Sequence, residues 1–262
     1  MDWGTLAVTD ASTVRIAGSD LHYRRLGTDF TSTPVLFLHE GLGSVELWRD
    51  FPNAVVEETR RPGLAYSRHG NGWSSPLSEP RRPEYMHEEA LETLPRVVDE
   101  LVGRPPILVG HSDGASIAII YAGSGHPVEG LVLIAPHVFV ESETVESIAS
   151  IRSEYPESEL PEKMAKYHID PMRTFYGWTD IWLSPSFRSW NIESYVAGVR
   201  CPTLLIQCDA DEYGTTDQLD AIDAGLASPA ERLIVGGVGH SPHLAEPELV
   251  LSAVVDFTGR LG

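Results

Sequence analysis

The stretch Pro106-Ile107-Leu108-Val109-Gly110-His111-Ser112-Asp113-Gly114 decides the fold of this 262-residue chain. Its apolar start predicts a buried strand, and the small and apolar residues at 115–122 predict a helix packed against a sheet. Ser112 lies between them in a G-x-S-x-G frame, where a sharp turn leaves the serine hydroxyl facing outward. Glycines two residues to either side let strand and helix pass close to that corner. Because such a frame arises by chance in roughly one chain in ten of this length, its context carries the argument.

Strand-like and helix-like segments alternate along most of the chain. Short apolar runs predict strands at residues 35–38, 64–67, 107–109, 131–134, 203–206 and 232–235. Leu91, Leu94, Val98 and Leu101 recur at helical spacing around a kinking Pro95, and a last helix is expected over about 242–257. Apolar strands separated by helices are typical of an α/β fold, in which a mostly parallel sheet has helices on both faces.

The segment from His137 to Tyr195 breaks this alternation because it contains no strand-like run. It carries charged helical sequence over 141–166, followed by an aromatic cluster that includes Trp178 and Trp182. An insertion of this length after a core strand is usually a functional lid. We therefore expect a helical cap at residues 137–195, placed on a core formed by residues 1–136 and 196–262. At least one of its aromatic rings is expected to line a substrate pocket.

The composition excludes several classes of function. The formal net charge of −19 and the pI near 4.8 argue against nucleic acid as a partner, and against anionic membrane surfaces, because both need basic residues. No apolar run approaches the roughly 18 residues of a membrane span. The N-terminus, Met1-Asp2-Trp3-Gly4-Thr5, has no basic region followed by an apolar stretch, so we expect no signal peptide.

The two cysteines, Cys201 and Cys208, bracket one short strand. In an extended chain they would lie about 20 Å apart, beyond the reach of a disulfide. Reduced thiols are therefore expected, and with the missing signal peptide they favour a cytoplasmic protein.

A serine hydroxyl needs a base within hydrogen-bond reach and a carboxylate that orients this base. His240 is the candidate base, since it follows a glycine-rich turn between the last predicted strand and the final helix. His243, three residues on, is expected to be structural or to line the rim. The acid should follow the strand at 203–206, where Asp209, Asp211 and Glu212 offer three carboxylates. Strand alternation does not choose among these three.

The oxyanion of an acyl-transfer reaction also needs hydrogen-bond donors in place. The N–H group of Asp113 is one candidate, because it lies at the start of the helix after Ser112, where the helix dipole helps. The second donor should come from the glycine-containing turn after the first core strand, His39-Glu40-Gly41-Leu42-Gly43.

With these motifs the chain resembles the α/β-hydrolase superfamily, in its cap-bearing group of esterases, lactonases and carbon–carbon bond hydrolases. The resemblance covers nearly everything after Leu21, and the order Ser112, acid, His240 is the family's order. It implies Asp211 as the acid, and Gly41, or less readily Leu42, as the second oxyanion donor. The sequence Tyr66-Ser67-Arg68-His69-Gly70-Asn71-Gly72-Trp73-Ser74 resembles a loop that is usually structural in this family.

Two residues depart from the family pattern. Glu40 stands where the family usually has glycine, so a carboxyl group lies beside the oxyanion turn. It either points away or faces the pocket, where it would repel anionic substrates. Cys208 replaces a common glycine in the acid motif, which we expect to change local packing only. Besides Glu40, the expected pocket residues are Leu42, His137, Trp178 and Trp182.

These observations predict a serine hydrolase that acts on a small, largely apolar ester, lactone or related carbonyl compound through an acyl-enzyme. Carbon–carbon cleavage, or a lyase reaction on the same triad, is the alternative within enzymes. A ligand-binding receptor with a slow or silent triad is the alternative from another class, and a purely structural protein would leave the triad unexplained. No cofactor and no metal are expected, because the histidines lack a ligand spacing. The partner is a small-molecule substrate, and the oligomeric state, a homo-oligomer included, stays open.

Overall fold

One mixed sheet forms the centre of the computed structural model, which describes residues 12–27 and 32–261. The strand order is β1-β2-β4-β3-β5-β6-β7-β8, and β2 runs antiparallel to both β1 and β4 while the remaining pairs are parallel. The bounds are β1 (Ser12–Ile16), β2 (Ser19–Leu26), β3 (Val35–Leu38), β4 (Gly63–Tyr66), β5 (Ile107–His111), β6 (Gly130–Ile134), β7 (Thr203–Cys208) and β8 (Glu231–Val235). The N-terminal residues used above for the expectation about a signal peptide lie outside the described part.

All six predicted strands are confirmed within one or two residues, but the hairpin of β1 and β2 was not predicted. Its two-residue turn, Ala17 and Gly18, has positive φ angles of 51° and 85°. This geometry matches the twist of a tight hairpin. The Ala-Gly pair between two alternating segments is the sequence signal that could have indicated it.

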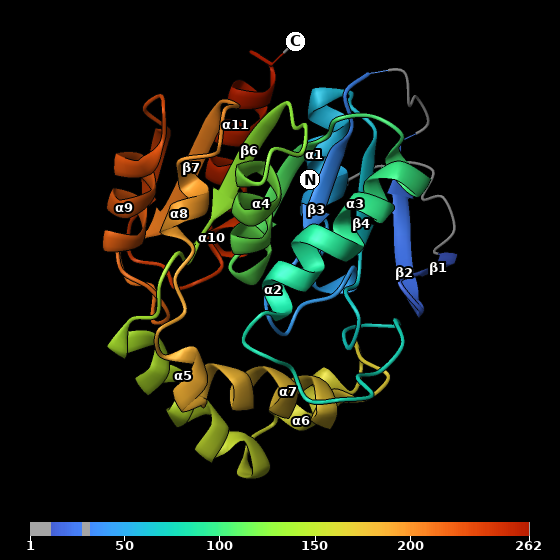
Figure 1. Cartoon of the computed structure of the whole chain (residues 1–262), viewed down its shortest axis with the longest axis vertical. Helices are drawn as coiled ribbons and strands as arrows, with labels where there is room; N and C mark the ends of the chain where they lie inside the picture. Colours follow the sequence, from blue (N-terminus) through green and yellow to red (C-terminus); the bar gives the residue numbers. More distant parts are fainter. Residues whose placement is uncertain (1–11, 28–31, 262) are drawn as a thin grey trace.

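The two faces of the sheet bury alternate residues of the same strand. On β3, Val35 and Phe37 pack on the side of α1 (Phe51–Thr59) and α11 (Pro247–Thr258). Leu36 and Leu38 pack on the opposite side. The helices on that side are α2 (Tyr85–Glu88), α3 (Leu94–Val97), α4 (Asp113–Gly123), α8 (Glu193–Val196) and α9 (Asp217–Gly225). Coverage on both faces explains why the parallel strands read as continuous apolar runs (Figure 1).

Two predicted helices are interrupted. Between α2 and Gly103 the helix contains π-helical turns at Glu89–Thr93 and Val98–Val102, and Pro95 lies in the first turn of α3. The wider π turn changes the helical phase, so Ala90 is buried while Leu91 is exposed. The final helix is divided into α10 (Pro242–Ala245) and α11, because Pro247 starts a new helix.

Most of the chain between β6 and β7 is helical, and its first helices lie beyond one end of the sheet, whereas α8 packs beside the sheet (Figure 1). The segment forms α5 (Ser142–Glu154), α6 (Leu160–Met164) and α7 (Pro171–Leu183) before α8. The start of α7 is fixed by Pro171 in its first turn and by the Asp170 carboxylate, which accepts a hydrogen bond from the Arg173 N–H at 2.9 Å. In the described part of the chain, short 3₁₀ helices occupy Glu46–Trp48, Tyr155–Glu157 and Pro185–Phe187. The division into core and cap at residues 137 and 195 remains a prediction.

Candidate active site

Ser112 occupies the corner between β5 and α4 with a φ of 53°, which non-glycine residues rarely adopt. Close packing imposes this corner. A Cβ atom on Gly114 would lie 1.9 Å from the Leu38 carbonyl oxygen, and one on Gly110 would lie 2.5 Å from the Gly114 carbonyl oxygen. Only glycine fits at either position, so the two glycines of the G-x-S-x-G frame are structural requirements of the turn.

The three candidate carboxylates after β7 have different hydrogen-bond partners. The Nδ1 atom of His240 lies 2.9 Å from both Oδ1 and Oδ2 of Asp211. Asp209 instead accepts a hydrogen bond from the Gly237 N–H at 2.6 Å, and Glu212 accepts one from the His240 backbone N–H at 3.2 Å. Only Asp211 therefore contacts the imidazole, while the other two hold the backbone of the loop that carries it.

Asp211 is itself held in place by two hydrogen bonds. The Gln207 side chain donates to its Oδ2 at 2.8 Å, and the Tyr213 N–H donates to its Oδ1 at 2.8 Å. Burial alone would raise the pKa of Asp211, but the hydrogen bond and charge of His240 lower it below the ordinary value. Asp211 is therefore an anion at neutral pH, as an orienting carboxylate must be.

His240 has a pKa above its ordinary value of 6.5. Burial alone lowers this pKa, but the hydrogen bond and charge of Asp211 outweigh burial, with further contributions from Glu212 and Glu40. The ring of His111 also holds the loop that carries His240, because its Nε2 atom lies 2.8 Å from the His240 carbonyl oxygen. The negative surroundings favour an imidazole that accepts a proton.

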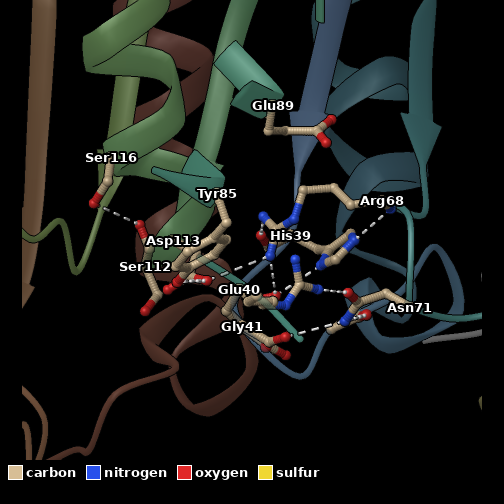
Figure 2. Close-up of polar contacts among 12 residues, drawn as sticks. His39, Glu40, Gly41, Arg68, Asn71, Tyr85, Glu89, Ser112, Asp113 and Ser116 are labelled. Atoms are coloured by element: carbon tan, nitrogen blue, oxygen red, sulfur yellow. Dashed lines mark hydrogen bonds and ion pairs between the residues drawn. The ribbon is translucent and has the colours of Figure 1, made fainter. Parts of the chain in front are cut away.

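A buried arginine and an asparagine hold the turn after β3 by its carbonyl groups (Figure 2). Arg68 donates to the carbonyl oxygens of His39 at 2.5 Å and Glu40 at 3.0 Å. The Asn71 side chain donates to the carbonyl oxygens of Gly41 and Gly43, both at 3.0 Å. Both side chains belong to the loop at residues 66–74, which was predicted to be structural. Its structural role is to hold the turn after β3 in place.

These hydrogen bonds determine where the N–H groups of the turn point. In a trans peptide unit the C=O and N–H groups point in opposite directions. Since Arg68 holds the Glu40 carbonyl, the Gly41 N–H points away from Arg68. The Leu42 N–H acts on the Glu40 carboxyl group, whose pKa it lowers. The assignment of Gly41 as the second oxyanion donor remains a prediction.

A buried polar network connects the residue after Ser112 with helix α7. The Asp113 carboxylate lies 3.6 Å from the Arg68 guanidinium and accepts a hydrogen bond from the Tyr85 hydroxyl at 2.7 Å (Figure 2). The indole Nε1 of Trp182 donates to the same hydroxyl at 3.1 Å. Asp113 was predicted only for its backbone N–H, and the roles of Tyr85 and of the Asp113 side chain were missed, because no motif pairs these positions.

A cavity of about 200 Å³ is lined by most of the predicted site residues, but not by Asp113 or Asp211. Ser112, His240 and Gly41 line it, together with all five predicted pocket residues, whereas Asp211 lies behind His240. Five further residues that line the cavity were not predicted from the sequence: Thr144, Ile148, Glu212, Tyr213 and Ser241. Trp178 packs directly against the oxyanion turn, since a Cβ atom on Gly41 would lie 2.2 Å from its Nε1 atom.

The remaining histidines of this region are neutral. Burial lowers the pKa of His137 to about 4 and that of His243 to about 3, and it lowers the pKa of His111 well below its ordinary value. His243 is packed between the Trp48, Phe51 and His111 rings, which agrees with a structural role. Across residues 12–27 and 32–261, no group of three or more histidine, cysteine or acidic side chains is arranged to hold a metal ion.

The sheet order, the serine corner and the helices on both faces define an α/β-hydrolase fold. The chain belongs to the alpha/beta hydrolase family, whose model matches residues 35–253. Members of this family are hydrolases. In the part of the chain that the structure describes, no helix is long and apolar enough to cross a membrane.

Matches to individual curated proteins cover less than half of this chain. A proline iminopeptidase from Lactobacillus crispatus (strain ST1) is 30% identical over 111 residues, which are 42% of this chain and 38% of that protein. An sn-1-specific diacylglycerol lipase from Mus musculus is 30% identical over 102 residues, 39% of this chain and 32% of that protein. The chain thus matches well under half the length of these curated relatives.

Solved structures resemble nearly the whole chain. The enol-lactonase from Burkholderia xenovorans LB400 has a TM-score of 0.73 at 17% identity, covering 95% of this chain and 100% of that chain. A thermophilic esterase from Thermogutta terrifontis has a TM-score of 0.69 at 18% identity, covering 96% and 99%. At such identities the likeness shows the fold alone.

Proposed function

We propose that this protein is a serine hydrolase of small, largely apolar esters, lactones or related carbonyl compounds. One observation carries the proposal: the imidazole of His240 is paired with Asp211 at 2.9 Å and lines the same small cavity as the strained Ser112. A histidine base that is oriented by a carboxylate and lies beside a serine hydroxyl is what the activation of this weak nucleophile requires.

In the proposed reaction, His240 takes the proton of Ser112 as the hydroxyl oxygen attacks the substrate carbonyl carbon. The Gly41 and Asp113 N–H groups bind the oxyanion, and Asp211 stabilises the charged imidazole. His240 then gives its proton to the leaving group, which leaves an acyl-enzyme. Water, deprotonated by His240, releases the acid and restores Ser112.

The cavity supports a small substrate. Its volume of about 200 Å³ lies below the roughly 300–1,000 Å³ of pockets for drug-sized ligands. Leu42, Ile148, Trp178 and Trp182 provide its apolar walls. Short acyl groups fit this space better than long chains.

The test is the intact mass of the protein after exposure to a small fluorophosphonate. We expect one adduct on the wild type and none on the Ser112→Ala variant, whose fold should be retained by circular dichroism. A folded wild type without an adduct would contradict the proposal and would favour a ligand-binding protein with a silent triad. Product analysis with esters and vinylogous diketones then distinguishes ester hydrolysis from carbon–carbon cleavage.

A further inference from the structure

Two carboxyl groups line the cavity at Ser112. Its lining includes the carboxyl groups of Glu40 and Glu212 and contains no lysine or arginine. Both carboxylates act on groups inside the cavity, because each contributes to raising the pKa values of His240 and Tyr213. Glu40 therefore lines the wall of this cavity, with its Oε1 atom also close to Gly43 of the same turn, where a Cβ atom would lie 2.9 Å from it.

Glu40 lacks an ion-pair partner among residues 12–27 and 32–261. The nearby guanidinium of Arg68 contacts the Glu40 backbone oxygen and the Asp113 carboxylate. Burial raises the pKa of Glu40 to about 7, although the Arg68 charge acts against this shift. A carboxyl group that is costly to ionise when the cavity is empty gains most from a cation placed beside it.

The aromatic rings that line the cavity also favour a cation. Trp178, Trp182 and Tyr213 line the cavity, and Trp178 and Tyr213 pack edge to face with ring centroids 6.2 Å apart. Aromatic rings attract ammonium groups electrostatically, and this attraction strengthens where water is excluded. A cavity lined by carboxyl groups and aromatic rings, and by no lysine or arginine, is suited to bind a cation.

We infer that the substrate carries a primary amine on its acyl part, held by the Glu40 carboxylate beside the oxyanion turn. This inference rests on the proposed function, because it names the acyl group transferred to Ser112. Because Glu40 and Gly41 line the same cavity, we expect an ammonium group held by Glu40 to lie near the carbonyl whose oxygen the Gly41 N–H would bind. Glu40 is thereby a specificity-determining residue.

Three 4-nitrophenyl esters with linear acyl chains test this inference, and the first two are matched in size. The 3-aminopropanoyl ester carries a cation, the butanoyl ester is neutral and the 3-carboxypropanoyl ester carries an anion. At pH 8, with spontaneous hydrolysis subtracted, we expect kcat/KM to fall in that order. The ratio of the first two should be roughly ten- to a hundredfold, the range of a hydrogen bond to a charged group.

Variants assign the preference to Glu40. Glu40→Gln should reduce the cation-to-neutral ratio by about tenfold or more, and Glu40→Asp should restore part of it. Glu57→Gln is the matched control, because it removes one exposed carboxylate of α1 and should leave the ratio unchanged. An equal ratio in the wild type and in Glu40→Gln would overturn the inference while leaving the hydrolase proposal intact.

A binding experiment separates the two proposals if no ester is turned over. Calorimetric titration of the Ser112→Ala variant with 3-aminopropanamide and butanamide should show tighter binding of the amine, and Glu40→Gln in that background should remove the difference. Amine binding without any turnover would support the cation site and contradict the hydrolase. Equal binding of the two amides would contradict the cation site.

Discussion

The Nδ1 atom of His240 lies 2.9 Å from each carboxyl oxygen of Asp211, and neither Asp209 nor Glu212 contacts this ring. Asp211→Asn should therefore lower kcat by about 10⁴-fold, the cost of losing the orienting carboxylate in such triads. Asp209→Asn removes only a bond to the Gly237 N–H and should cost less than about tenfold. Steady-state ester hydrolysis by both variants measures this difference, and a larger loss in Asp209→Asn would refute the assignment of the acid.

The pH dependence of kcat/KM follows from the raised pKa of His240. The proposed base must be neutral, so activity should increase with pH through an apparent pKa above 6.5. Glu40 and Glu212 both raise this pKa, so replacing either with glutamine should move the midpoint to lower pH. Profiles measured with the neutral butanoyl ester provide the check. A midpoint that neither substitution shifts would contradict this account of the electrostatics.

Arg68 should be essential for stability. Arg68→Ala leaves the buried Asp113 carboxylate without its charge partner, so the free energy of unfolding should fall by about 3–5 kcal/mol. The exposed pair of Arg15 and Asp20 is the control, and Arg15→Ala should cost less than about 1 kcal/mol. Urea unfolding of the two variants measures both values. Similar losses would mean that the buried pair contributes no more than a surface pair.

Gly41 should tolerate no side chain while Trp178 is present. A Cβ atom at residue 41 would lie 2.2 Å from the Trp178 Nε1 atom, so either the turn or the indole must shift. Gly41→Ala should lower kcat/KM on the order of a hundredfold, since displacements of about 1 Å have such effects. Adding Trp178→Ala should recover part of this loss. A double variant no better than Gly41→Ala would place the damage in the turn itself.

Local patterns predicted the parallel part of the fold. Runs such as Val35–Leu38 and Ile107–Val109 are apolar on both faces, and helices cover both faces of the sheet. The hairpin of β1 and β2 was missed because its strands are half-exposed and lack such runs. The phase change at Leu91 was missed as well, because a π turn leaves no periodic signal.

The candidate site could be predicted where a residue lies in a motif or directly after a predicted strand. Ser112 and His240 follow predicted strands, and the resemblance selected Asp211, which the structure places against the imidazole. The residues that hold these groups were not predictable in the same way. Tyr85 and Asp113 are 28 positions apart and meet only through tertiary packing. The orientation of Glu40 likewise depends on the path of the turn, which Arg68 and Asn71 fix from another loop.

Helix α7 contacts one proposed oxyanion donor directly and is linked to the side chain of the other through a tyrosine. Trp178 packs on Gly41, and Trp182 reaches Asp113 through the Tyr85 hydroxyl. Trp178 and Trp182 lie four residues apart on this one helix, so a displacement of α7 is expected to disturb the surroundings of both proposed donors together.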